Sequence, residues 1–156
     1  MLLVRRLSQR ALLAGVICTR ALVSQLAFGV AGVVRDEAGR VLLVRSRFGS
    51  GWGLPGGGVG RGEPPDAAVQ RELREEVGLA ESRPPELFGL YTRRVAWATN
   101  VIALYEIPGA RIDFRPNFEI REIRWVDPAA PPRGVQVGSA RRLAELTGQV
   151  PRSAYW

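Results

Sequence analysis

The sequence feature that most constrains this chain is a glycine-rich segment followed directly by a helix rich in glutamate. Phe48–Gly62 contains eight glycines, too many for a regular helix or strand. Glu63–Gly78 has a helical pattern, with two prolines at its start and a glycine at its end. Glu72, Glu75 and Glu76 are spaced i, i+3 and i+4, so their side chains project from one side of that helix. The sequence therefore predicts a flexible backbone loop beside a concentrated acidic surface.

An acidic surface of this kind needs compensation. Like charges at these spacings repel by about a few tenths of a kcal/mol per pair. Arg71 and Arg74 offset part of the repulsion, and a divalent cation would offset far more, because Mg²⁺ prefers hard oxygen ligands. Glu63 adds a fourth carboxylate from the loop. For the helix glutamates alone, a solvated acidic face is the simpler interpretation.

The composition removes several kinds of chemistry. All 22 basic side chains are arginines, histidine is absent, and Cys18 is the only cysteine. These absences exclude a Ser-His-Asp triad, a histidine metal ligand, a Schiff-base lysine and an intrachain disulfide. Carboxylates, hydroxyls, arginines and a bound metal are left to carry any reaction.

The rest of the chain reads as alternating strands and helices. Residues 1–24 are predicted to form a basic amphipathic helix, which packs on the domain or a partner, lies on a membrane surface, or is cleaved. Strands are predicted at 26–34 and 40–45, paired as a hairpin, and at 86–92, 96–106 and 119–126. A final helix is predicted at 137–147. This order favours an α/β fold, a mixed sheet covered by helices.

The segment from Gly57 to Leu79 resembles the Nudix box, Gly-x5-Glu-x7-Arg-Glu-U-x-Glu-Glu-x-Gly-U, where U is aliphatic. All seven fixed residues and both aliphatic positions are present without a gap, in Gly57, Glu63, Arg71-Glu72-Leu73, Glu75-Glu76 and Gly78-Leu79. The resemblance implies the Nudix fold, an α/β/α sandwich, within a domain over residues 25–156. It also implies hydrolysis of a pyrophosphate bond in a nucleoside diphosphate linked to another moiety, with Mg²⁺ or Mn²⁺ as cofactor.

The same resemblance implies roles for the residues of the box. Glu72 and Glu76 are the expected metal ligands, and Glu75 is a ligand or the general base. Gly57 is expected to help through its carbonyl, and Glu63 as a weaker ligand or a group behind the ligands. Arg71 is expected to hold the carboxylates in place by ion pairing.

Other candidate residues lie outside the box. Members of the family often use a further acid from beyond it, and Glu119, with Glu122 as the alternative, is the preferred candidate. Arg45 and Arg47, just before the glycine-rich loop, are candidates for contacts to phosphate oxygens. Trp52 is the candidate for stacking on a base or sugar.

The charge distribution bears on partners. The chain carries a net charge of +7, and the excess lies at its two ends, over residues 1–34 and 107–156. We therefore expect a cytoplasmic enzyme acting on a small nucleotide, with nucleic acid not favoured. A pyrophosphohydrolase acting on RNA 5′ ends and a non-catalytic nucleotide sensor are the alternatives. The sequence leaves open a homodimer and peripheral membrane contact, and it contains no run long enough to span a bilayer.

Overall fold

The computed structural model describes residues 26–156, and these form a mixed α/β fold. The elements are β1 (Leu26–Val34), β2 (Val41–Ser46), α2 (Pro65–Val77), β3 (Leu79–Glu81), β4 (Glu86–Val95), β5 (Ala98–Ile107), β6 (Arg111–Ile112), β7 (Ile120–Val126) and α3 (Val137–Leu146). The predicted helix over residues 1–24 lies outside the described residues, so the division of the chain at residue 24 stays a prediction. None of the helices in the described part is long and apolar enough to cross a membrane.

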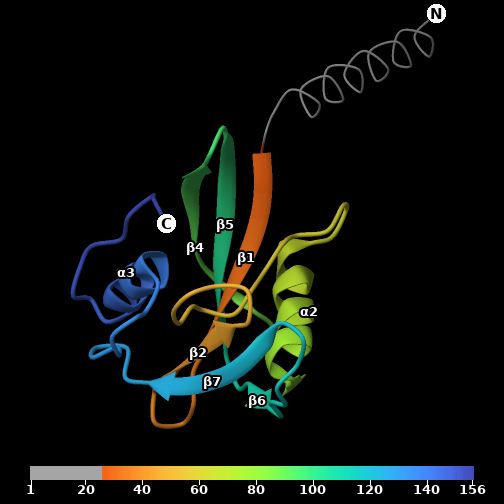
Figure 1. The fold of residues 1–156 in the computed structure, drawn as a ribbon, viewed down its shortest axis with the longest axis vertical. Helices are drawn as coiled ribbons and strands as arrows, with labels where there is room; N and C mark the ends of the chain where they lie inside the picture. The colour runs from red at the N-terminus through yellow and green to blue at the C-terminus, as the bar shows by residue number, and fades with distance from the viewer. Residues whose placement is uncertain (1–25) are drawn as a thin grey trace, which may run out of the picture.

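The strands pair in three groups. In the main group the order is β1-β5-β4, with β1 parallel and β4 antiparallel to β5. β2 pairs with β7, and the short β3 pairs with β6, both antiparallel. α2 and α3 lie on opposite sides of the β1-β5-β4 sheet (Figure 1). The predicted mixed sheet covered by helices is therefore confirmed.

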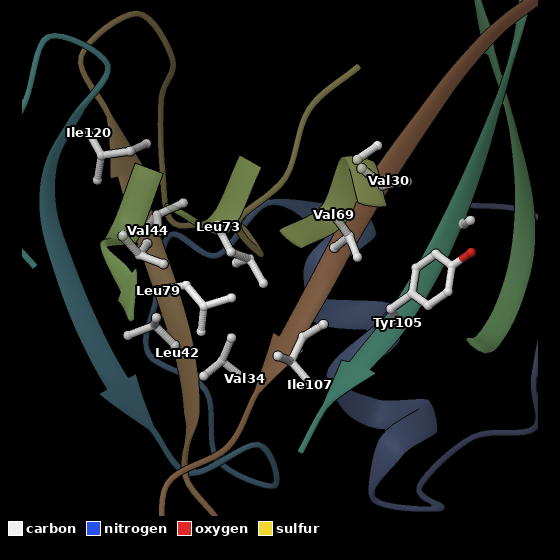
Figure 2. Packing of buried hydrophobic residues seen from close by; sticks show 13 residues of the cluster. Val30, Val34, Leu42, Val44, Val69, Leu73, Leu79, Tyr105, Ile107 and Ile120 are labelled. Atoms are coloured by element: carbon white, nitrogen blue, oxygen red, sulfur yellow. The ribbon is translucent and has the colours of Figure 1, made fainter. Parts of the chain in front are cut away.

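From Gly29 to Val34, strand β1 is buried on both faces, and this part of the strand divides the core in two. Val30 and Val34 pack with the apolar side of α2, as Figure 2 shows, whereas Ala31 and Val33 belong to the cluster that contains Leu143 of α3. Successive side chains of a strand point to opposite faces, so one strand supplies both clusters. The result is a helix–sheet–helix sandwich.

The predicted hairpin between the first two strands is wrong. The strands are joined by a turn, in which Asp36 accepts hydrogen bonds from the backbone N–H groups of Ala38 and Arg40. Only one bridge, Arg35 with Val41, connects the two strands. Beyond it β1 pairs with β5 and β2 with β7, because each strand finds its long apolar partner far away in the sequence.

Helix α2 confirms the predicted helix with shifted bounds. Ala68, Val69, Leu73 and Val77 are buried on one side of it. The helix ends at Gly78, which is left-handed with φ 69° and donates its N–H to the Arg74 carbonyl. A side chain there would overlap the Asp113 carbonyl, so only glycine fits.

The glycine-rich loop runs along the edge of β1 that β5 leaves open. Val30 N–H donates to the Gly57 carbonyl and Gly32 N–H to the Pro55 carbonyl, both at 2.9 Å. Gly56 has φ 146°, and a Cβ on it would overlap the backbone of Val30. The glycines thus let the loop approach β1 closely, and this approach places the loop beside α2.

Candidate functional site

The three predicted glutamates of α2 differ in environment. Glu76 is 5% exposed and lies on the buried side of the helix, where its Oε2 accepts a hydrogen bond from Gly56 N–H at 2.7 Å. Glu75 is exposed, and Glu72 lies at the boundary between core and solvent. The exposure of the three carboxylates therefore increases from Glu76 through Glu72 to Glu75.

Arg71 gathers the carboxylates, as its predicted ion pairing requires. Its Nε and Nη2 donate to the two oxygens of Glu63, at 2.8 and 3.0 Å. Its Nη1 donates to Glu72 at 2.8 Å and to Glu75 at 3.3 Å. Nη2 also donates to the Gly58 carbonyl at 2.9 Å, so this one side chain joins the loop to the helix.

Gly57 lies directly against Glu72. A Cβ on Gly57 would come within 2.6 Å of the Glu72 carboxyl carbon, so a larger residue would displace that carboxylate. The Gly57 carbonyl accepts the Val30 N–H and retains a second lone pair. Two of the expected metal ligands, the Gly57 carbonyl and the Glu72 carboxylate, therefore come from adjacent residues in the structure.

Glu119 joins this cluster from the segment before β7. Glu76 has three carboxylate neighbours, and of these Glu119 repels its charge most strongly, ahead of Glu72 and Glu75. Glu122 instead faces Arg45 and Arg124, each at 4.0 Å. The structure thus brings Glu119, and not Glu122, to the acidic cluster.

Asn117, which no sequence motif singled out, positions Glu119. Its side-chain Nδ2 donates to the carbonyls of Glu75 and Glu76, at 3.1 and 3.0 Å. Its Oδ1 accepts the N–H groups of Glu119 and Ile120, at 3.0 and 2.7 Å. Asn117 therefore fastens the Glu119 segment to the end of α2, a contact across more than 40 residues that no local pattern indicates.

The pKa values of two carboxyls reflect this arrangement. Burial, reinforced by repulsion from Glu119, Glu72 and Glu75, raises the pKa of Glu76 to about 8 against the opposing Gly56 hydrogen bond. The Arg71 guanidinium and the Gly60 N–H lower the pKa of Glu63 to about 2. Arg71 itself has a raised pKa through the same hydrogen bonds. The site thus contains an excess of negative charge that one arginine does not balance.

The donor set fits a divalent cation. Within residues 26–156 no three acidic or cysteine side chains converge as a metal site, and Glu72 and Glu76 accept hydrogen bonds from Arg71 and from the Gly56 N–H. The donors nevertheless are all hard oxygens, and Glu76 is a buried carboxylate surrounded by other carboxylates. A cation among them would remove the repulsion that raises the Glu76 pKa.

The three predicted substrate-binding residues lie in different places. Trp52 is 5% exposed and belongs to the α3-side core, and the Arg124 guanidinium lies 4.6 Å from its ring centre. This burial argues against the expected stacking on a nucleotide. Arg47 binds the Glu119 segment through its N–H to the Glu119 carbonyl and its Nε to the Asn117 carbonyl, both at 2.8 Å. Arg45 is partly exposed beside Glu122.

A pocket of about 340 Å³ lies beside the glycine-rich loop. Its walls come from the first half of β1, from the loop at Gly56–Gly58, and from Arg93, Asn100 and Trp156. Arg93 and Asn100 face each other across the β4–β5 pair. Gly57 of this loop thus lines the pocket and also lies against Glu72 of the acidic cluster.

Comparison with known proteins points to one family. A model of the NUDIX domain matches residues 25–146. A MutT-like protein of Streptomyces ambofaciens is 32% identical over 123 residues, which cover 78% of each chain. An RNA pyrophosphohydrolase of Actinobacillus succinogenes is 32% identical over 95 residues, covering 60% of this chain and 44% of that protein.

The fold agrees with these relatives. The crystal structure of a MutT NUDIX hydrolase from Burkholderia pseudomallei superposes with a TM-score of 0.69. The superposition covers 79% of this chain and 99% of that one, at 23% identity. At this identity the likeness concerns the fold alone.

The raised pKa of Glu76 predicts a pH-dependent stability in the metal-free protein. The pKa of Glu76 is about 8 in the folded protein against an ordinary 4.5, so the folded state retains a proton that the unfolded state releases. This stabilisation is complete below about pH 4.5 and is lost as the pH rises through 8. Between pH 6 and 8 we expect urea unfolding in EDTA to show a loss of roughly 2 kcal/mol.

The control for that experiment is Glu76→Gln, which resembles the neutral acid in shape. Its free energy of unfolding is expected to be nearly flat between pH 6 and 8, since the chain has no histidine to titrate there. Equal slopes for the variant and the parent protein would show that Glu76 is not the group responsible.

The hydrogen bonds of Asn117 predict a second outcome. Asn117→Ala removes four bonds that join the Glu119 segment to α2, so we expect a destabilisation of about 2–3 kcal/mol in urea unfolding. Gln149→Ala, which removes a single exposed bond to the Ala129 carbonyl, is the matched control and should cost less than about 0.5 kcal/mol. A similar, small loss for both variants would contradict the positioning role.

Proposed function

The chain belongs to the Nudix family, and on that premise we propose that it hydrolyses a pyrophosphate bond in a nucleoside diphosphate linked to another group. One observation carries the proposal. Gly56–Gly58 forms part of the pocket wall, and within this stretch Gly57 also lies against Glu72. A nucleoside in the pocket would therefore place its diphosphate at the loop, next to the carboxylates.

Family membership implies a divalent cation, Mg²⁺ or Mn²⁺ in this proposal. Glu72, Glu75 and Glu76 would hold it, with the Gly57 carbonyl and Glu63 as further oxygen donors. When bound, the cation would neutralise charge on the diphosphate and acidify the attacking water. The oxygen-only donor set and the carboxylates of Glu72, Glu75 and Glu119 around Glu76 support this assignment.

The chain's own side chains have separate tasks in the proposed reaction. Arg71 keeps Glu63 and Glu72 oriented and holds the loop through the Gly58 carbonyl. Glu119 is the proposed general base that takes the proton of the attacking water, because it lies beside the buried Glu76 and no hydrogen bond neutralises its carboxylate within residues 26–156. Glu75, exposed and weakly held by Arg71, is the second candidate.

The pocket residues support a nucleoside as the bound group. The pocket's volume, and its lining of apolar residues with a few polar ones, match a small-molecule site. Asn100 offers an amide that can both donate to and accept from a base edge, and Arg93 offers a cation. Arg45 and Arg47 stay candidates for contacts to the departing phosphate, since both lie near the Glu119 segment.

The proposal predicts metal-dependent release of phosphate or pyrophosphate. We expect turnover with Mg²⁺ or Mn²⁺ on at least one of a panel of nucleoside triphosphates, nucleotide sugars, ADP-ribose and dinucleotides, and none in EDTA. Glu76→Gln and Glu119→Gln should each lower kcat by roughly 10²-fold or more. Glu122→Gln, a matched change on β7, should leave kcat within about twofold.

Two results would contradict this function. Turnover that survives in Glu76→Gln would remove the acidic cluster from the chemistry. Nucleotide binding without turnover on any substrate, indifferent to Glu76→Gln, would instead support a sensor module.

RNA carrying a 5′ di- or triphosphate is the second candidate substrate, and an exposed aromatic pair favours it. The rings of Phe48 and Phe118 lie 5.2 Å apart and are 71% and 83% exposed. They adjoin Arg47 and Glu119 in the sequence, so the pair lies beside the acidic cluster. Exposed aromatic rings next to arginines are a stacking surface for single-stranded bases.

This second candidate predicts a selective effect. Phe118→Ala should raise KM for a 5′-triphosphate RNA oligonucleotide roughly tenfold while leaving hydrolysis of a mononucleotide unchanged. Leu90→Ala, a change of another exposed apolar residue on β4, is the control. Equal KM values for RNA in Phe118→Ala and the parent protein would contradict RNA as the substrate.

A further inference from the structure

The segment from Arg152 to Trp156 returns to the sheet and lies along the outer edge of β4. Thr92 N–H donates to the Ala154 carbonyl at 2.8 Å, and Trp156 N–H donates to the Thr92 carbonyl at 2.9 Å. Arg152 donates to the Phe88 carbonyl and lies over the Phe88 ring at 3.8 Å. Figure 1 shows this segment leaving α3 and ending beside β4. The segment is therefore attached to the sheet edge at two points of β4.

A buried ion pair on α3 holds the 152–156 segment in place. Arg142 of α3 has no exposed surface, and its Nη2 donates to Glu145 at 2.7 Å. Its Nη1 donates to the Tyr155 carbonyl at 2.9 Å, and the Ser153 N–H donates to Glu145 at 2.9 Å. A buried ion pair is costly unless its hydrogen bonds are used. Here each partner makes one hydrogen bond to the backbone of the 152–156 segment, while the Nε of Arg142 is buried without a partner among the described residues.

Tyr91 completes this anchor. Its hydroxyl donates to Glu145 at 2.9 Å, and its ring lies 4.0 Å from the Arg142 guanidinium. The Trp156 indole packs edge-on against the Tyr91 ring, with 5.7 Å between ring centres. The indole also covers Gly138, where any Cβ would overlap it. Trp156 is thus held by its backbone, by Tyr91 and by the bare backbone of Gly138.

The held indole forms one wall of the 340 Å³ pocket. The other walls include Phe28, Asn100 and the Gly56–Gly58 backbone. A partly exposed indole in a pocket with an amide on another wall suits a flat heteroaromatic ring with a hydrogen-bonding edge. A nucleobase has this chemistry, whereas inorganic polyphosphate has none of it.

We propose that Trp156 is the specificity-determining residue of this pocket, stacking on the nucleobase and so selecting nucleotides over base-free di- and triphosphates. The proposal rests on the proposed function for the location of the diphosphate, and adds the residue that recognises the base. The buried Arg142–Glu145 pair and Tyr91 act as positioning residues, because they reach the pocket only through Trp156.

The test measures binding separately from hydrolysis. Dissociation constants of the full chain for non-hydrolysable nucleoside triphosphate analogues with different bases are determined by calorimetry. Trp156→Ala is expected to weaken binding roughly 10- to 100-fold, the range of base–aromatic stacking. Trp156→Phe should retain most of the affinity. Tyr155→Ala, which removes an exposed neighbouring ring, is the matched control and should bind like the parent protein.

Two further measurements distinguish recognition from a general structural effect. With a hydrolysed nucleotide, Trp156→Ala should raise KM by a similar factor while kcat at saturation and turnover of inorganic tripolyphosphate stay unchanged. Gly138→Ala keeps the indole but displaces it through the added Cβ, so it should weaken binding in the same direction. Circular dichroism and thermal unfolding of each variant report whether the fold is retained.

The outcomes separate this proposal from the proposed function. Hydrolysis by the parent protein with equal nucleotide affinity in Trp156→Ala would overturn the role of Trp156 alone. Trp156-dependent nucleotide binding without hydrolysis would support that role and contradict the proposed function. Failure of the parent protein to bind any nucleotide analogue would overturn the proposal for Trp156.

Discussion

The guanidinium of Arg71 is the contact on which the acidic cluster depends. It donates to Glu63, Glu72, Glu75 and the Gly58 carbonyl, so it links the loop to the helix and offsets part of the repulsion among the carboxylates. Gly58, whose carbonyl accepts one of these hydrogen bonds, also lines the pocket, so this one side chain contacts both the acidic cluster and a segment of the pocket wall. Its planar fork, with several donors in fixed directions, suits this task better than a point charge would.

Close backbone packing provides the frame for that contact. Gly56 and Gly57 let the loop lie against β1 and against Glu72 without an intervening Cβ. Gly32 of β1 leaves room for the Leu73 side chain of α2, so the helix packs closely against the sheet. Glu76 is then buried next to the Gly56 N–H, and this burial raises its pKa. The raised pKa of Glu76 therefore depends on the close backbone packing at Gly32 and Gly56.

The acidic cluster and the pocket are built from different parts of the chain. The acidic cluster is built mainly from Glu63–Glu76, one continuous stretch, with Glu119 added from a distance. The pocket combines β1, β4, β5, the loop and the 152–156 segment, which meet only in the folded sheet. The chemistry proposed for this chain thus lies mainly in a local motif, whereas the recognition proposed for it lies in residues brought together by topology.

The sequence by itself determined α2, its glycine end and the strands later seen as β1, β2, β4, β5 and β7, because periodicity and turn residues are local. The spacing of Glu72, Glu75 and Glu76 also put these carboxylates on one side of the helix, whereas the ion pairing of Arg71 was expected only from the resemblance to the Nudix box. Only the tertiary structure decided that β1 and β2 separate instead of pairing, that Trp52 is buried, that Asn117 joins the Glu119 segment to α2, and that Trp156 lines the pocket. Those outcomes depend on which distant strand covers which face, and no local spacing encodes that choice.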